Sequence, residues 1–128
     1  MPTLDDINDL LEEANAKLNE AMHAIRDLPL EPKRDHMHRI GKALSEIYDI
    51  QYHVFALKPE LTPRALQGPF DHPEGALNVA LRHAHAAEES GNPDLATAIL
   101  RWVAPRITGE HRKRAEAEIS RLAGKRDA

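Results

Sequence analysis

The feature that most constrains the fold is a heptad-spaced apolar stripe in the first 28 residues. Apolar side chains recur there at alternating steps of three and four: Leu4, Ile7, Leu11, Ala14, Leu18, Ala21, Ile25 and Leu28. This spacing is typical of a helix that packs lengthwise against a neighbour. It predicts a helix from Thr3, which can cap the first turn, to about Leu28, where Pro29 and Pro32 break it.

A second apolar stripe predicts a second long helix, from about Lys33 to Leu57. Its seam is Met37, Ile40, Leu44, Ile47, Gln51 and Val54, with further apolar side chains on both flanks. So wide an apolar arc must be covered from two directions, which predicts that this helix is central. Gln51 interrupts the seam, and two interpretations stay open: a buried amide that sets the register, or a half-exposed side chain.

The remaining residues predict a proline-rich linker over 58–74, in which Thr62 and Pro63 can start one helical turn, and three shorter helices over 75–124. Gly91 is expected to end the first of these helices, and Pro105 the second. We therefore expect a single all-α domain over residues 1–128. It is a five-helix bundle, in which the antiparallel hairpin of residues 3–57 packs against the three short helices.

Composition excludes several classes of function. The chain has 128 residues and no cysteine, so disulfides and thiolate metal sites are excluded. It shows no signal peptide and no long apolar run, which predicts a cytoplasmic protein. We find no P-loop, Rossmann glycines, nucleophile elbow or HExxH motif, so no cofactor is expected.

Eight histidines offer a metal-binding alternative. Two imidazoles with a carboxylate can hold Zn²⁺ or Fe²⁺, and the strongest candidate ligands lie in the linker and the third helix: His72, His83, His85, Glu88 and Glu89. His83 and His85 cannot chelate together, because residues two apart on a helix point about 200° away from each other. A partly buried, hydrogen-bonded His83 is the simpler interpretation.

A catalytic alternative rests on Arg106 and His111, which are separated by four residues where a loop becomes the last helix. This spacing resembles the Arg-x4–6-His motif of HEPN ribonucleases, small all-α proteins. The resemblance implies that the two residues work together at a composite active site of a dimer. A guanidinium can bind phosphate and an imidazole can move the proton.

The main prediction for function is non-catalytic: a helical surface presented to a protein partner or to a second copy. Surplus apolar surface on the second and fourth helices favours this interpretation. The largest expected anchors are the aromatic side chains Tyr48, Phe55, Phe70 and Trp102. Nucleic acid is not an expected partner, because the basic C-terminal cluster lacks interleaved aromatics and is diluted by glutamates.

Overall fold

The computed structural model describes residues 1–127 and confirms the all-α class. Over these residues it contains five α-helices, three short 3-10 helices and no strand. The chain divides into two compact units, Met1–Val54 and Phe55–Ala128, with the boundary in the last turn of the second helix. Within the described residues, no helix combines the length and apolar character needed to cross a membrane.

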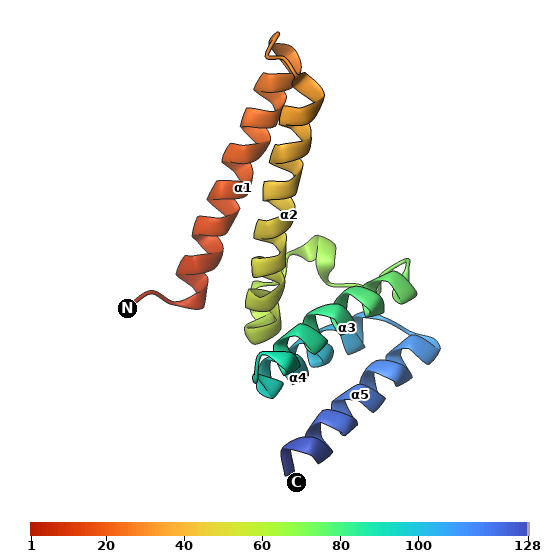
Figure 1. Ribbon diagram of the computed structural model, residues 1–128. Coiled ribbons are helices and arrows are strands. Elements are labelled where there is room, and N and C mark those ends of the chain that lie inside the picture. Colours follow the sequence, from red (N-terminus) through yellow and green to blue (C-terminus); the bar gives the residue numbers. More distant parts are fainter. Residues whose placement is uncertain (128) are drawn as a thin grey trace. The chain divides into compact units, whose positions relative to one another are not determined.

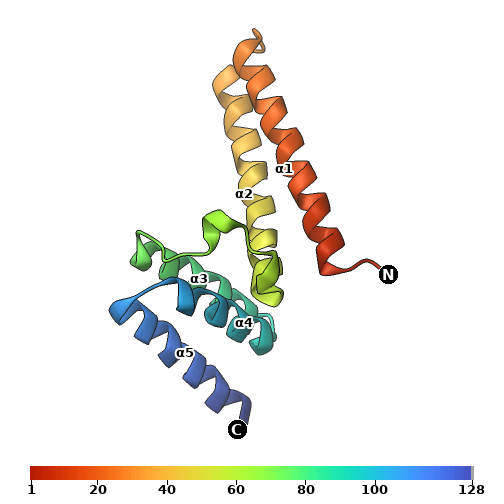
Figure 2. The same cartoon turned by 180° about the vertical axis from the view of Figure 1, so that it is seen from behind.

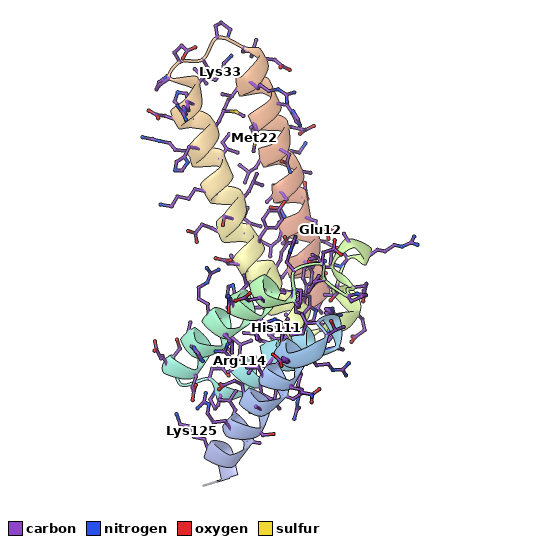
Figure 3. The ribbon with its side chains drawn as sticks, turned by 90° about the vertical axis from the view of Figure 1, so that its right-hand side faces the viewer. Glu12, Met22, Lys33, His111, Arg114 and Lys125 are labelled. Carbon is purple, nitrogen blue, oxygen red and sulfur yellow. The ribbon has the colours of Figure 1, made fainter. Side chains whose placement is uncertain are left out.

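The first unit is a helical hairpin whose predicted bounds are confirmed. Helix α1 spans Leu4–Asp27, and Thr3 caps it by accepting a hydrogen bond from the Asp6 amide at 3.2 Å while its own amide donates to Asp6 at 2.9 Å. Helix α2 spans Lys33–Leu57. The two helices run side by side in opposite directions (Figures 1 and 2). Met22 and Lys33 lie in the half of the hairpin near its turn (Figure 3).

The apolar stripe of α1 is less buried than its spacing predicts. Asn8 is the buried residue of α1, whereas the apolar seam positions are half-buried or exposed. Ile7 and Leu28, two of those positions, keep 39% and 59% of their surface exposed. The prediction of a packed seam is therefore met only in part, because one neighbouring helix covers one side of an apolar arc that extends around a flank.

A small polar layer joins the two helices of the hairpin. The Gln51 side chain is buried, and its amide nitrogen donates to Asn8 Oδ1 at 3.4 Å. Its amide oxygen accepts a hydrogen bond from Asn15 Nδ2 at 2.8 Å. Of the two interpretations of Gln51, the buried amide is the one observed. The layer aligns residue 51 of α2 with the stretch of α1 between Asn8 and Asn15.

The second unit is built from three helices around an apolar core. They are α3 (Pro73–Glu89), α4 (Pro93–Val103) and α5 (Gly109–Asp127), and α4 packs against both of the others. The inward face of α3 is buried throughout: Leu77, Ala80, Leu81, Ala84 and Ala87. The largest fully buried side chains are Leu77, Ile99, Leu100, Val103, Ile107 and Leu122.

The turn between α3 and α4 forms as the sequence predicts. Gly91 has a φ of 81°, and its amide donates to the Glu88 carbonyl at 3.0 Å. The Asn92 amide reaches back to the Ala87 carbonyl at 2.9 Å, which closes the end of α3. The Asn92 side chain then caps α4 by accepting from the Leu95 amide at 3.1 Å.

The linker contains two short 3-10 helices before α3. The turn predicted after Thr62 and Pro63 is present at Arg64–Leu66 (η2), and an additional turn lies at Pro59–Leu61 (η1). A third, η3, covers Ala104–Arg106 and includes Pro105, which ends α4 as expected. Thr62 is buried and accepts a hydrogen bond from the Trp102 indole at 2.9 Å, so the linker is fastened to α4.

The polar layer yields a prediction about stability. Replacing Gln51 by Ala should lower the free energy of unfolding by about 1–3 kcal/mol, because the buried Asn8 amide loses its partner. Urea unfolding followed by circular dichroism measures this change. The exposed Ser45→Ala in the same helix is the control and should stay within about 0.5 kcal/mol of the parent. Equal stability of the two variants would show that the layer contributes nothing.

Candidate functional site

One side of the hairpin carries apolar side chains from both helices. Successive residues of an α-helix are turned by about 100° about the helix axis. In this projection one apolar flank of α1 spans about 60° and carries Ile7, Leu10, Ala14 and Ala21. The corresponding flank of α2 carries Ala43, Ile47 and Ile50. We call these seven residues the hairpin face.

Helical geometry places both flanks on the same side of the hairpin. Starting from the polar layer of Asn8 and Gln51, each flank is reached by turning in the same sense about its own helix axis. Because the helices are antiparallel, that shared sense leads to one side of the pair. Tyr48 is reached from Gln51 by turning in the opposite sense about the axis of α2, so it lies on the other side of the hairpin.

The hairpin face is most exposed toward the end of the hairpin where α1 begins. Leu10 is 65% exposed, Ile50 is 50% exposed and Ile7 is 39% exposed. The three alanines and Ile47 are half-buried. Single exposed apolar residues are ordinary, but a continuous set on one side of two helices is typical of a surface that another helix covers.

Charged side chains border the hairpin face on both edges. On α1, Lys17 and Glu20 form an exposed ion pair with 3.6 Å between Lys17 Nζ and Glu20 Oε2. On α2, the exposed side chains of Lys42 and Glu46 border the opposite edge. Exposed pairs of this kind contribute little to stability and exchange partners at little cost.

The four aromatic anchors predicted from the sequence are not gathered on one surface. Phe55 and Trp102 are buried at 4% and 3% exposure, so they belong to the core of the second unit. Phe70 is half-buried, with its ring centroid 6.2 Å from that of Trp102. Tyr48 remains as an exposed aromatic side chain, on the side of the hairpin away from the hairpin face.

Arg106 of the predicted catalytic pair is held by backbone carbonyls and an aromatic ring. Its guanidinium carbon lies 4.5 Å from the centroid of the Trp102 ring, and Nε donates to the Leu66 carbonyl at 3.2 Å. A second nitrogen, Nη1, donates to the Trp102 carbonyl at the end of α4. The side chain therefore joins the linker to α4, which is a structural use of its donors.

The linker passes unusually close to Arg106 at Gly68. A Cβ atom at position 68 would lie 2.9 Å from the Arg106 Cβ and carbonyl oxygen, and Gly68 has a φ of 81°. The next contact is a hydrogen bond from the Phe70 amide to the Arg106 carbonyl at 2.9 Å. Glycine is needed here for both conformation and space.

His111 lies in a different hollow from Arg106. An open hollow of about 530 Å³ is lined by His111 at the start of α5 together with Asp71, His72 and Glu74. The Arg106 side chain lines another hollow, beside Trp102 and Arg101. Within one chain, the predicted catalytic pair therefore does not converge on a single hollow, and the ribonuclease interpretation stays an untested prediction.

The residues of the metal-binding alternative are not assembled into a site. Among the residues that the structure describes, no group of three or more His, Asp or Glu side chains is placed to hold a metal ion. His72 lines the hollow near His111, whereas His85 Nε2 lies 3.9 Å from Glu118 Oε2 on α5. His83 is half-buried, and Glu89 is exposed.

Glu88 has basic partners on α5. Its two carboxylate oxygens accept hydrogen bonds from Arg121 at 2.8 and 3.2 Å and from Lys125 at 2.9 Å. Hydrogen bonds from these two cations, Arg121 first, lower the pKa of Glu88 from 4.5 to about 2. The same pairing raises the pKa of Arg121. Glu88 thus fastens α3 to α5; Lys125 lies near the end of that helix (Figure 3).

The hairpin face includes a residue that heptad counting leaves out. Leu10 falls one position before the seam residue Leu11, so a search for a two-position seam omits it. Ile50 lies on a flank of α2 that the sequence marks as apolar without assigning it a use. The signal was the width of the apolar arc on both helices, rather than its period.

Searches of protein-family models, curated proteins and solved structures found no match to this chain. The assignment of a function therefore depends on the geometry of the described residues.

A conservative substitution tests the structural role of Arg106. Arg106→Lys should lower the free energy of unfolding by about 1–3 kcal/mol, because an ammonium cannot both stack on Trp102 and donate to two carbonyls. Chemical denaturation measures the loss, and the exposed Arg101→Lys on the preceding helix α4 is the control. An Arg106→Lys protein as stable as the parent would contradict the structural role.

Glu88 predicts a pH dependence of stability. Because its pKa is about 2 in the folded protein and about 4.5 unfolded, its contribution is complete above about pH 4.5 and disappears as the pH falls toward 2. Glu88→Gln should therefore lower the melting temperature much more at pH 7 than at pH 2, where about half of the Glu88 carboxyls are already protonated. Thermal unfolding at both values tests this, with the exposed Glu89→Gln as control. A melting-temperature deficit of the same size at pH 2 and pH 7 would exclude the ion pairs as its cause.

Proposed function

We propose that the protein is a non-catalytic interaction protein that acts by presenting the hairpin face to another helical protein surface. The observation that carries the proposal is the exposure of Leu10, Ile50 and Ile7 on one side of two adjacent helices. Apolar surface bordered by charged residues is a common property of protein interfaces.

The energetics of the hairpin support this proposal. Full burial of a Leu or Ile side chain stabilises a protein by about 1.5–3 kcal/mol relative to leaving it in water. Leu10 and Ile50 stay largely exposed, so much of this stabilisation is missing in the hairpin, whereas the buried core residues of the second unit provide it. A helical partner that covers the face recovers this free energy on binding.

The charged border supports the same interpretation. Lys17, Glu20, Lys42 and Glu46 surround an apolar centre that contains no charged residue, and that arrangement matches the polar rim and apolar core of protein interfaces. The small side chains Ala14, Ala21 and Ala43 allow a partner helix to approach closely. Helices with small residues at their contact pack at short interaxial distances.

Site-specific photo-crosslinking tests the proposal. A photoreactive amino acid placed at position 10 should crosslink to a protein in the cells that express this chain, because position 10 lies on the hairpin face. The same amino acid at Ala16, which is exposed on another side of α1, is the matched control and should give no such product. Equal crosslinking from both positions, or none from position 10, would contradict the proposal.

A further inference from the structure

We infer that the hairpin face binds the hairpin face of a second copy of this chain, so that two hairpins form an antiparallel four-helix bundle. In this bundle α1 of each copy lies beside α2 of the other. The inference rests on the proposed function and names its partner. Three properties of the hairpin carry it: its size, its distribution of charge and the levels of its charged residues.

The area of one side of the hairpin is close to what a stable dimer needs. Helix α1 contains 24 residues, which at about 1.5 Å per residue make a rod of about 36 Å. Two such helices side by side, each about 10 Å wide, present roughly 700 Å². A standard interface buries about 800 Å² per partner. One whole side of the hairpin, which is the hairpin face together with its charged border, is thus close in area to one half of a standard interface.

The distribution of charge favours one orientation of the second copy. Between Leu4 and Asp27, α1 has seven acidic and two basic side chains, a net charge of −5. Between Lys33 and Leu57, α2 has three acidic and four basic side chains with neutral histidines, a net charge of +1. Two faces can stack with α1 beside α1 or with α1 beside α2. Stacking α1 beside α1 brings two helices of net charge −5 together, so electrostatic repulsion favours the arrangement with α1 beside α2.

The polar layer sets the levels at which charges meet across such a dimer. The hydrogen bonds of Gln51 to Asn8 and Asn15 place residue 51 level with the middle of that stretch of α1. Counting back along the antiparallel helix, Glu46 is then level with Lys17, and Lys42 is level with Glu20. Within one hairpin these residues border opposite edges of the face. In the dimer, the border of α1 lies against the border of α2 of the second copy.

This arrangement pairs opposite charges twice. Lys17 of each copy meets Glu46 of the other, and the two-fold axis repeats the contact. Glu20 and Lys42 meet in the same way one turn further along. Each α1 then has two antiparallel neighbours, its own α2 and that of the second copy, which is the usual packing of a four-helix bundle. Leu10 and Ile50 become buried without any change in the hairpin.

A mixing experiment with two charge-reversed variants tests the inference. In a dimer of the Lys17→Glu variant, each new Glu lies beside Glu46 of the other copy. In a dimer of the Glu46→Lys variant, each new Lys lies beside Lys17 of the other copy. Each variant alone should dimerise about tenfold more weakly than the parent at low salt, because attraction becomes repulsion at two contacts. Mixed together, they should form a heterodimer with near-parental affinity, because both contacts are then of opposite sign. Analytical ultracentrifugation of labelled variants measures all three affinities.

Leu10→Asp and the matched Ala16→Asp provide the second arm. Both introduce the same charge into α1, but only position 10 lies on the hairpin face. Leu10→Asp should weaken dimerisation at least a hundredfold, because an unpaired carboxylate would be buried in apolar surroundings. Ala16→Asp should leave it unchanged, and circular dichroism verifies that both variants keep their helices.

The outcomes separate this inference from the proposed function. A parent protein that is monomeric at all accessible concentrations overturns the inference. The proposed function still stands in that case if position 10 crosslinks to a different protein. A dimer in which the charge-reversed variants mix at random overturns the pairing of α1 with α2. A dimer that survives Leu10→Asp excludes the hairpin face as its interface.

Discussion

The constraint on which the hairpin depends is that each of its helices has an apolar arc wider than one neighbour can cover. A helix with an apolar arc of about 100° needs contact on that whole arc to remove it from water. In the hairpin, α1 and α2 cover one edge of each other's arc and leave the adjoining flank open. The exposure of Leu10 and Ile50 follows directly from this geometry.

The second unit shows the contrast. There α4 packs against both α3 and α5, and its apolar side chains Ile99, Leu100 and Val103 are completely buried. Polar contacts then fasten the surrounding segments: Trp102 to Thr62, and Arg106 to the Leu66 carbonyl. Here one central helix has enough neighbours, so polar side chains are used for attachment and no comparable apolar face remains on α4.

Much of the fold could be predicted from the sequence because its helix ends are marked by local chemistry. Thr3, Gly91 and Pro105 act through contacts within one turn, and each ends or begins a helix where expected. The candidate site was harder to predict. The depth to which Phe55, Trp102 and Arg106 are buried depends on residues distant in the sequence, so their roles in the core could not be read from spacing. Similarly, Leu10 and Leu11 are the same residue type at adjacent positions of α1. Leu10 is exposed and Leu11 is half-buried because of where α2 lies, which the sequence alone does not show.

The polar layer explains how an exposed apolar face and a defined hairpin can coexist. Apolar contacts alone are tolerant of sliding, because many registers bury similar area. A buried amide that must satisfy its hydrogen bonds penalises every register but one, and Gln51 supplies this with Asn8 and Asn15. The register of α1 and α2 is therefore set without the residues of the hairpin face. Because those residues do not set the register, they can contact a partner, and the charges beside them stay at defined levels.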